Sequence, residues 1–531
     1  MENRYNRRLT KADIEEILSR RFANDIHTRL SKIPKPELLK DITRAAERIK
    51  EAITRKEKIA IVGDYDADGV VSSVIIGEFF EDIGVDIQLI IPNRFTDGYG
   101  INARIIDRLD ADVIITVDNG ISATEAAEIC KARNIDLIIT DHHTPPETLP
   151  DAYAIVNPKQ NECTFPSSEI CGAQVAWYLC AAIKNTLQIN YDLSKFLDVL
   201  SIAIVADMME LRDINRTMVK SGLHYINHSK RPAFAVIRKF FNKNYFKSED
   251  ISYLLAPLIN SAGRIEDATL SYDLLRAKDP YSAMEKLEYI VSLNNRRKEI
   301  EQELVTLART KVDEQQNIVV VWGEEWHEGV IGIVASRLAK HYKKPAVVFS
   351  VNDEVAKGSA RSVGSIDILH YIAEQKDLLL GYGGHIGAAG LSLSKAHLPE
   401  FKRRIEASIK DAKPEDFLQK SEILGELDPG AVDFELLELL ERYEPYGQKN
   451  PMPLFIIKNA YVKYQKIIGK NNNHQKLILQ SENATLESVQ FNFDRQVKAG
   501  SRVDVICTIS KNEFRGEITP QVMIRELLPK E

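Results

Sequence analysis

The chain has 531 residues, of which 44% are apolar and 28% charged, and its formal net charge is −7 at neutral pH. This length exceeds what a single hydrophobic core supports, so we expect three or more globular units, and the composition excludes bulk disorder. The net charge argues against a uniformly basic nucleic-acid-binding protein, although it describes the whole surface and not one groove.

The cysteines and the N-terminus indicate the compartment. The five cysteines show no CxxC spacing and lie mostly within apolar runs, which predicts reduced, packed thiols and no zinc site. The N-terminal stretch has no apolar signal core, and no segment approaches the ~20 apolar residues of a membrane span. We therefore expect a cytoplasmic protein without membrane contact, and a monomer.

The first half of the chain predicts an α/β domain. Residues 1–55 predict an N-terminal helical segment, and in residues 56–230 short apolar runs that end in polar clusters alternate with helical patterns. Continuous apolar strands of this kind are typical of a parallel sheet with helices on both faces, and such sheets bind ligands at the carboxyl ends of their strands.

The second half predicts three further parts. The helical periodicity of residues 231–316 predicts a helical connector that includes one long helix over 270–316. The apolar runs of residues 317–410 predict a second α/β unit. Residues 411–450 predict a helical linker. The short alternating runs of residues 451–531, which carry an excess of basic residues, predict a small antiparallel barrel.

Acidic side chains follow the apolar runs of the first α/β domain. They occur in "DYDADG", "VDNG" and "TDHH", and a further run closes with "VAD". If these run ends are neighbours, their like charges can coexist only around cations. Oxygen-rich ligation with a histidine suits Mn²⁺ or Mg²⁺. Two such ions that share a carboxylate would activate water and stabilise the leaving oxygen of a phosphoryl displacement.

The alternative is that these clusters are ordinary turns. Asp-Gly is a common turn signal, and one cluster of this kind is structural about as often as functional. The repetition at several run ends favours a two-ion metal centre. The candidate ligands are Asp64, Asp66, Asp68, Asp118, His142 and Asp207.

The ordered motifs resemble those of the DHH phosphoesterase superfamily. The acidic motifs correspond to its DHH domain, and "NSAGRIEDA", "WHEGVIGIVASRL", "KGSARS" and "GGHIGAAG" to its DHHA1 lobe and connector. The series covers the chain from about residue 50 onward, and it is similar to the superfamily's single-stranded-DNA-specific exonucleases. The resemblance implies an α/β fold with DHH and DHHA1 lobes joined by a long helix, followed by a barrel like the oligonucleotide-binding (OB) fold.

The resemblance also implies roles for the ligands. Asp66, with help from Asp64, and the shared Asp118 would hold one ion. The other ion would be held by Asp68, Asp118, His142 and Asp207. His143 would then contact the scissile phosphate, so the catalytic residues would be Asp118, His142 and His143. Many small-molecule relatives have a histidine four residues before the first motif aspartate, where this chain has Val62.

Two further groups of residues are candidates for gripping the substrate. Arginine presents a planar fork suited to phosphate, and glycine lets the backbone approach a ligand closely. For "GGHIGAAG" alone, a tight turn before a packed helix is the simpler interpretation. The candidate phosphate-binding residues are Arg94, Asn260, Arg264, Ser359, Arg361, Gly384 and His385. In the barrel, Tyr461, Lys463, Phe491 and Phe493 are candidates for base stacking and backbone contact, unless they are barrel core and solvated surface.

The function that the resemblance implies is 5′ to 3′ degradation of single-stranded DNA to mononucleotides in DNA repair and recombination. Family partners would be single-strand-binding protein and a helicase. Two alternatives stay open at this point. One is a DHH-family phosphodiesterase or phosphatase that acts on short RNA or nucleotides, and the other is a non-catalytic replication scaffold.

Overall fold

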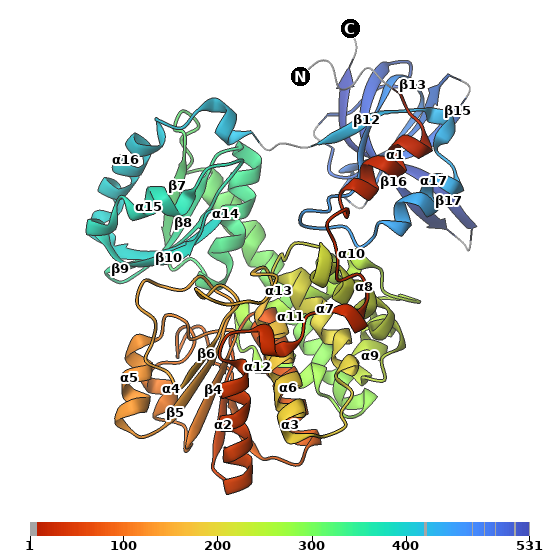
Figure 1. Ribbon diagram of the computed structural model, residues 1–531. Helices are drawn as coiled ribbons and strands as arrows, with labels where there is room; N and C mark the ends of the chain where they lie inside the picture. The colour runs from red at the N-terminus through yellow and green to blue at the C-terminus, as the bar shows by residue number, and fades with distance from the viewer. Residues whose placement is uncertain are drawn as a thin grey trace.

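The computed structural model describes residues 8–418, 422–469, 471–482, 484–493, 495–514 and 517–529. It confirms the predicted fold class, because two α/β lobes and a C-terminal barrel are grouped around a set of helices (Figure 1). Within those ranges no helix combines the length and apolar character needed to cross a bilayer.

The DHH lobe is built on a five-stranded parallel sheet with the order β3-β2-β4-β5-β6. Its strands are apolar runs because helices cover both faces, α4 and α5 on one side and α2, α3 and α6 on the other (Figure 1). The strands are β2 (Ile59–Val62), β3 (Ile87–Ile90), β4 (Val113–Val117), β5 (Asp136–Thr140) and β6 (Ala154–Val156). The helices are α2 (Ile42–Arg55), α3 (Ala67–Asp82), α4 (Ala103–Ile106), α5 (Thr124–Ala132) and α6 (Gly172–Leu187).

A group of helices follows the sheet. The apolar run before Asp207 forms helix α7 and not a strand. The sequence does not reveal this helix, because all its early positions are buried in the lobe core and leave no amphipathic period. The long helix begins at Pro280, later than predicted, because the Asp279 side chain caps it. The helices are α7 (Leu197–Ala206), α8 (Asp213–His228), α9 (Pro232–Phe240), α10 (Ser248–Asp250), the π-helix η4 (Ile251–Leu255), α11 (Ala256–Ile265), α12 (Thr269–Leu275) and α13 (Pro280–Arg309).

The DHHA1 lobe has a five-stranded sheet with the order β10-β11-β9-β8-β7, in which only β7 and β8 are parallel. The segment "GGHIGAAG" lies in the antiparallel β10–β11 hairpin, so the interpretation as a turn before a helix is wrong. The strands are β7 (Val319–Glu324), β8 (Ala346–Asn352), β9 (Val355–Arg361), β10 (Leu379–His385) and β11 (Ala388–Ser394). The helices are α14 (Glu328–Tyr342), α15 (Ile368–Ala373) and α16 (Leu398–Ile409).

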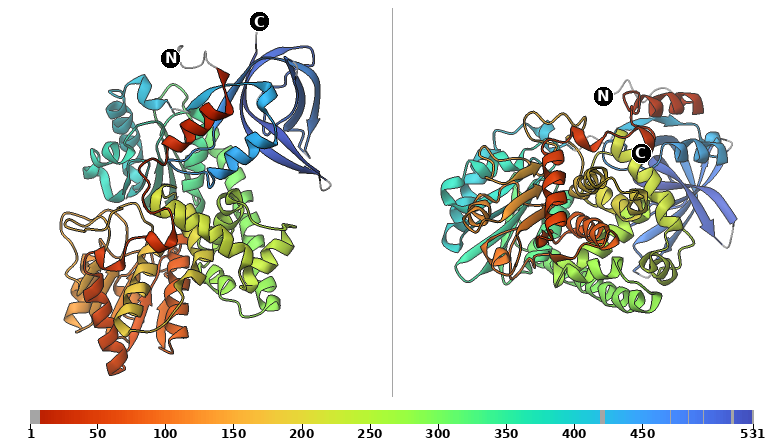
Figure 2. Two further views of the ribbon diagram at one scale, coloured as in Figure 1. Left: turned by 45° about the vertical axis from the view of Figure 1, so that its right-hand side comes forward. Right: turned by 60° about the horizontal axis from the view of Figure 1, so that its bottom comes forward.

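The C-terminal barrel closes through the pairing of β13 with both β14 and β16. The predicted helical linker contains α17 (Phe434–Arg442) but also strand β12 (Ile423–Leu427), which joins the barrel sheet. The N-terminal segment reaches the same sheet, since β1 (Arg8–Leu9) pairs with β12 and α1 (Lys11–Arg20) packs on the barrel core (Figure 2). The remaining strands are β13 (Leu454–Ile468), β14 (His474–Ser481), β15 (Ala484–Gln490), β16 (Arg502–Phe514) and β17 (Glu517–Pro529).

Candidate metal centre and phosphate pocket

The first acidic motif forms the turn from β2 into α3. Asp66 is the N-cap of α3, and its Oδ1 accepts hydrogen bonds from the backbone N–H groups of Asp68 (2.9 Å) and Gly69 (3.1 Å). Asp64 and Asp68 are buried on either side of it. A Cβ at Gly69 would lie 2.5 Å from the Asp64 Cβ, so glycine is what allows the helix to start this close to Asp64.

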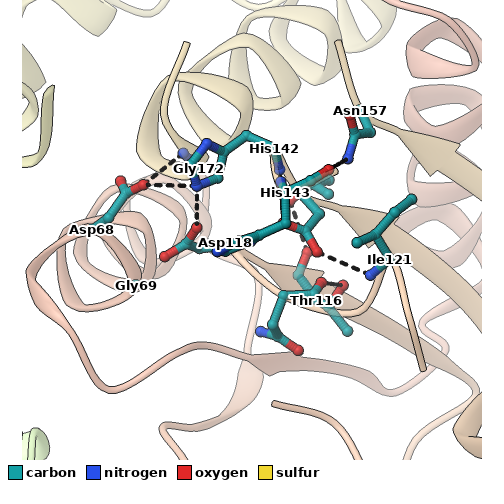
Figure 3. A network of polar contacts seen from close by, with 12 residues as sticks. Asp68, Gly69, Thr116, Asp118, Ile121, His142, His143, Asn157 and Gly172 are labelled. Carbon is teal, nitrogen blue, oxygen red and sulfur yellow. Dashed lines mark hydrogen bonds and ion pairs between the residues drawn. The ribbon is translucent and has the colours of Figure 1, made fainter. Parts of the chain in front are cut away.

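Asp68 is held by a second helix. The backbone N–H groups of Gly172 and Ala173, at the start of α6, donate to its two carboxylate oxygens at 2.7 and 2.8 Å (Figure 3). The positive end of α6 therefore points at the acidic cluster. Gly172 also packs against Asp118, where a Cβ would lie 2.5 Å from the Asp118 Cβ. Sequence reasoning missed this glycine because it is far along the chain from both motifs that it contacts.

The second and third motifs end β4 and β5. Asp118 adopts a left-handed backbone conformation with φ of 64°, which turns its side chain toward His142. The His142 Nε2 atom lies 3.2 Å from Asp118 Oδ1, 3.5 Å from Asp207 Oδ2 and 3.7 Å from Asp68 Oδ2. Burial lowers the pKa of His142 to about 3, so the imidazole is neutral and can serve as a ligand.

His143 differs from its neighbour in charge. Burial opposes its protonation, but the 2.7 Å hydrogen bond from its Nδ1 to Asp141 Oδ1 outweighs this and raises the pKa of His143 to about 9. The same pair lowers the pKa of Asp141 to about 2 against the effect of burial. Asp141 also accepts from the Ile121 N–H at 2.9 Å. It is a positioning residue that sequence reasoning did not single out, although the motif "TDHH" contains it.

The clustered carboxylates fit divalent cations. Burial first, and repulsion by neighbouring carboxylates second, raise the pKa values of Asp64, Asp118 and Asp207 well above their ordinary value. One oxygen of each of these three side chains is buried without a hydrogen-bond partner among the described residues. Ligand atoms within 4.8 Å of one another form three groups, namely Asp64–Asp66–Asp118, Asp68–His142–Asp207 and Asp118–His142–His143. Asp118 and His142 each belong to two of these groups. Buried carboxylate oxygens without a hydrogen-bond partner, arranged around these two residues, suit two cations that lie next to each other.

Three arginines from different elements lie beside the acidic cluster. Arg94 follows β3 and stacks on the Tyr65 ring at 4.2 Å, Arg264 ends α11, and Arg361 ends β9. Burial, with the nearby Arg94 charge second, lowers the pKa of Arg264 to about 10, and burial lowers that of Arg361. Across the described ranges none of the three forms an ion pair with a carboxylate, since Arg264 donates to the Gly329 carbonyl and Arg361 to Ser359 Oγ and its own neighbour's carbonyl. Their charges are therefore available to a phosphate.

The other predicted phosphate-binding residues are distributed around these arginines. Ser359 Oγ accepts from Arg361 Nη1 at 3.1 Å, and Asn260 Oδ1 accepts from the Ala67 N–H at 2.9 Å. Gly384 has φ of 149°, and His385 follows it at the exposed tip of the β10–β11 hairpin. Burial and the Arg361 charge lower the pKa of His385. The structure thus brings residues of both lobes close to the three arginines.

The predicted barrel residues lie far from this pocket in the chain and occupy the barrel surface. Tyr461 is exposed on β13 with the Arg502 guanidinium 5.8 Å from its ring centroid, and Lys463 is exposed two residues later. Phe491 is exposed and packs edge-on against His474, whereas Phe493 is half-buried. None of the four belongs to the closely packed barrel core.

Asn119 is a further residue that sequence reasoning missed. Its buried side-chain amide donates to the carbonyl oxygens of Val62, Gly63 and Val117, and its Oδ1 accepts from the Ile101 N–H. It therefore fixes the ends of β2 and β4 relative to each other. The motif "VDNG" contained it, but the pattern of a turn does not reveal such long-range bonds.

The lobes, the acidic cluster and the arginines define a DHH-type phosphoesterase. The sequence model of the DHH family N-terminal domain matches residues 58–204, that of the DHHA1 domain 315–411, and that of the RecJ OB domain 423–526. The chain belongs to the RecJ family. The protein named single-stranded-DNA-specific exonuclease RecJ of Haemophilus influenzae is 31% identical over 93% of this chain and 92% of its own length.

Other relatives agree with this assignment. RecJ of Escherichia coli is 31% identical over 92% of this chain and 91% of its own length. RecJ of Bacillus subtilis is 34% identical over 94% of this chain, which spans 65% of that relative's length. The crystal structure of Thermus thermophilus RecJ with Mn²⁺ is similar with a TM-score of 0.85 at 27% identity, covering 98% of this chain and 76% of that one. The same protein was also solved with Mg²⁺, with a TM-score of 0.79.

Proposed function

We propose that this chain is a metal-dependent exonuclease that degrades single-stranded DNA from the 5′ end to mononucleotides. The observation that carries the proposal is the position of three arginines, which have no carboxylate partner among the described residues, beside a cluster of buried carboxylates that includes Asp118. The carboxylates suit divalent cations, and the arginines suit the phosphate at the end of a DNA strand. The names of the relatives support the substrate class.

The three groups of neighbouring ligand atoms suggest which residues would hold each ion. Asp64, Asp66 and Asp118 would hold one Mn²⁺ or Mg²⁺ ion. The second ion would be held by Asp68, Asp118, His142 and Asp207. When bound, the two ions supply an activated water and charge compensation for the leaving oxygen.

The chain's own residues orient the substrate. The hydrogen bond from Nδ1 to Asp141 raises the pKa of His143 and so favours the protonated imidazole, whose Nε2–H can donate to a non-bridging phosphate oxygen. Arg94, Arg264 and Arg361 would bind the terminal 5′-phosphate and so define which end of the strand enters. An unpaired strand fits between two lobes more readily than a duplex, which selects single strands.

The barrel would bind the strand away from the cut. Tyr461 and Phe491 offer exposed ring faces for bases, and Lys463 offers a charge for the backbone. We further propose that the enzyme acts as a monomer in the cytoplasm during DNA repair and recombination, beside single-strand-binding protein and a helicase.

The test is an end-labelled cleavage assay. With Mn²⁺, the wild type should release mononucleotides from the 5′ end of a single strand and leave a blunt duplex intact. Asp118→Asn should abolish the release, whereas Asp110→Asn, which alters an exposed aspartate of the same lobe, should not change it. Release from the 3′ end, equal cutting of duplex, or an active Asp118→Asn variant would refute the proposal.

A further inference from the structure

One continuous helical segment contacts all three globular parts of the chain. This bridging helix comprises α10, η4 and α11, residues 248–265. At its start, Ser248 Oγ donates to Glu444 Oε2 (3.4 Å) of the barrel module. Near its end, Asn260 accepts from Ala67 beside the acidic cluster, and Arg264 Nη1 donates to Gly329 O (3.2 Å) of the DHHA1 lobe. The bridging helix therefore runs from the barrel side to the phosphate pocket (Figure 1).

Tyr253 projects from the middle of the bridging helix into solvent. Its exposed fraction is 84%, the largest for any large hydrophobic side chain among the described residues. Single exposed aromatics are common on protein surfaces, so exposure alone indicates nothing. Tyr281 is 83% exposed at the start of α13 and has no such relation to the site. What distinguishes Tyr253 is its place on the bridging helix.

Tyr253 shares a helix face with the pocket residues. From Tyr253, seven and eleven residues make about two and three α-helical turns, and the part of the wider π-helical turn in between shifts this register by less than a quarter turn. Asn260 and Arg264 therefore lie on roughly the same side as Tyr253. At a rise of about 1.5 Å per residue, Tyr253 is roughly 16 Å from Arg264 along the axis, toward the barrel. The π-helical turn at Ile251–Leu255 contains Tyr253, and such turns occur frequently at functional sites.

A strand that runs from the barrel to the pocket would cross this face. An exposed aromatic ring can stack on any base, whatever its sequence. We propose that Tyr253 is a stacking residue for a base of the single-stranded substrate between the phosphate pocket and the barrel. This inference rests on the proposed function.

The experiment compares variants on 5′-phosphorylated oligothymidylate with Mn²⁺. Because stacking stabilises a bound base substantially, Tyr253→Ala should raise KM about tenfold with kcat retained. Tyr253→Phe keeps the ring and should restore the wild-type KM, and Tyr281→Ala serves as the matched control. Thermal melting confirms that each variant is folded.

A set of oligomers with one abasic site at successive positions locates the contact. In the wild type, one position a short distance from the 5′ end should raise KM as much as Tyr253→Ala does, and in Tyr253→Ala that position should have no further effect. An unchanged KM for Tyr253→Ala, or an abasic effect equal in both proteins, overturns the inference. A wild type that leaves the oligomer uncut instead overturns the proposed function.

Discussion

Gly172 leaves the space that the Asp118 side chain occupies in the candidate metal centre. A methyl group at this position would overlap the Asp118 carboxylate, which belongs to two of the three ligand groups. We expect Gly172→Ala to displace Asp118 and to lower both Mn²⁺ affinity and kcat, the latter about a hundredfold, since misplacing catalytic groups by about 1 Å has effects of that size. Isothermal titration and single-turnover cleavage measure the two quantities.

The matched control for this prediction is Gly425→Ala. Its Cβ would lie 2.8 Å from the Leu9 side chain in the barrel module, so it introduces a similar crowding away from the metal ligands. It should reduce thermal stability without changing Mn²⁺ affinity. Equal Mn²⁺ affinity in Gly172→Ala and the wild type would contradict the prediction.

The acidic ligands also predict how stability depends on metal and pH. Burial raises the pKa of Asp68 from 3.8 to about 6, and that of Asp118 well above its ordinary value. Without metal, the folded state therefore keeps protons on these aspartates at pH values where the unfolded chain has released them. The contribution of this proton binding to the stability of the fold is complete below about pH 4 and is lost as the pH rises through about 6 and beyond. Bound Mn²⁺ replaces these protons.

We expect Mn²⁺ to raise the melting temperature more at about pH 8 than at about pH 5.5, relative to protein in EDTA. Differential scanning fluorimetry at both pH values measures the two shifts. In Asp118→Asn, which removes one carboxylate, the shifts should be smaller and closer to each other. Equal shifts in the wild type would show that the cluster does not exchange protons for metal.

The sequence singled out the candidate ligands, which the structure brings close together, but not what holds them in place. Asp66 and Asp118 were predictable because each lies in a short motif after an apolar run. Gly172 and Asn119 were not, since their roles come from contacts across the fold, to Asp118 and to the ends of β2 and β4. A motif records neighbours along the chain, whereas the precise placement of a carboxylate depends on neighbours in space.

At the scale of elements, the N-terminal segment connects two parts of the molecule. Ile14 and Leu18 of α1 lie in the barrel core, while Asp25 binds Arg212 Nη2 at 3.0 Å in the DHH lobe. Between them, Phe22 stacks on Tyr443 with ring centroids 6.0 Å apart. The sequence predicted only a helical segment here, because nothing in its pattern names the surface on which it packs.

Phe22 is the residue through which this connection can be weakened. The Arg216 guanidinium lies 4.3 Å from its ring centroid in addition to the Tyr443 contact. We expect Phe22→Ala to lower the free energy of unfolding by about 1–2 kcal/mol, from the loss of one aromatic and two cation–π contacts, the second of them with Arg212 at 5.4 Å. Urea unfolding measures this value, and small-angle scattering should show a larger radius of gyration as the barrel loosens.

Ile26→Ala provides the comparison, because Ile26 is an exposed side chain four residues further along the same segment. It should leave both unfolding and scattering unchanged. If Phe22→Ala behaves like Ile26→Ala, the N-terminal segment does not hold the barrel in place.

Helix α7 shows where element prediction fails. Its apolar run leads to a candidate metal ligand, Asp207, as the runs of β2 and β4 lead to other candidates. A fully buried helix lacks the polar face that would reveal it. The position of Asp207 was nevertheless predicted, because the motif rather than the element type carried it. Element type and site membership are thus separate questions.

For the whole molecule, the sequence predicted two lobes, a long helix and a barrel, and the structure confirms this fold class. It did not predict how the parts are arranged. That arrangement brings together Arg94, Arg264 and Arg361, which come from the first lobe, the bridging helix and the second lobe. The proposed phosphate pocket requires all three of these parts.

The pocket therefore predicts a preference for 5′-phosphorylated DNA that requires the DHHA1 lobe. Removing one charged hydrogen bond weakens binding by about 1.5–3 kcal/mol, so Arg361→Ala should raise KM roughly ten- to a hundredfold for a 5′-phosphorylated strand. A strand with a 5′-hydroxyl lacks the phosphate and should show little change, so the preference should disappear. Arg403→Ala, an exposed arginine on α16 of the same lobe, should keep it. Steady-state kinetics on both strands decide the matter, and a preference that survives in Arg361→Ala would place the 5′-phosphate outside this pocket.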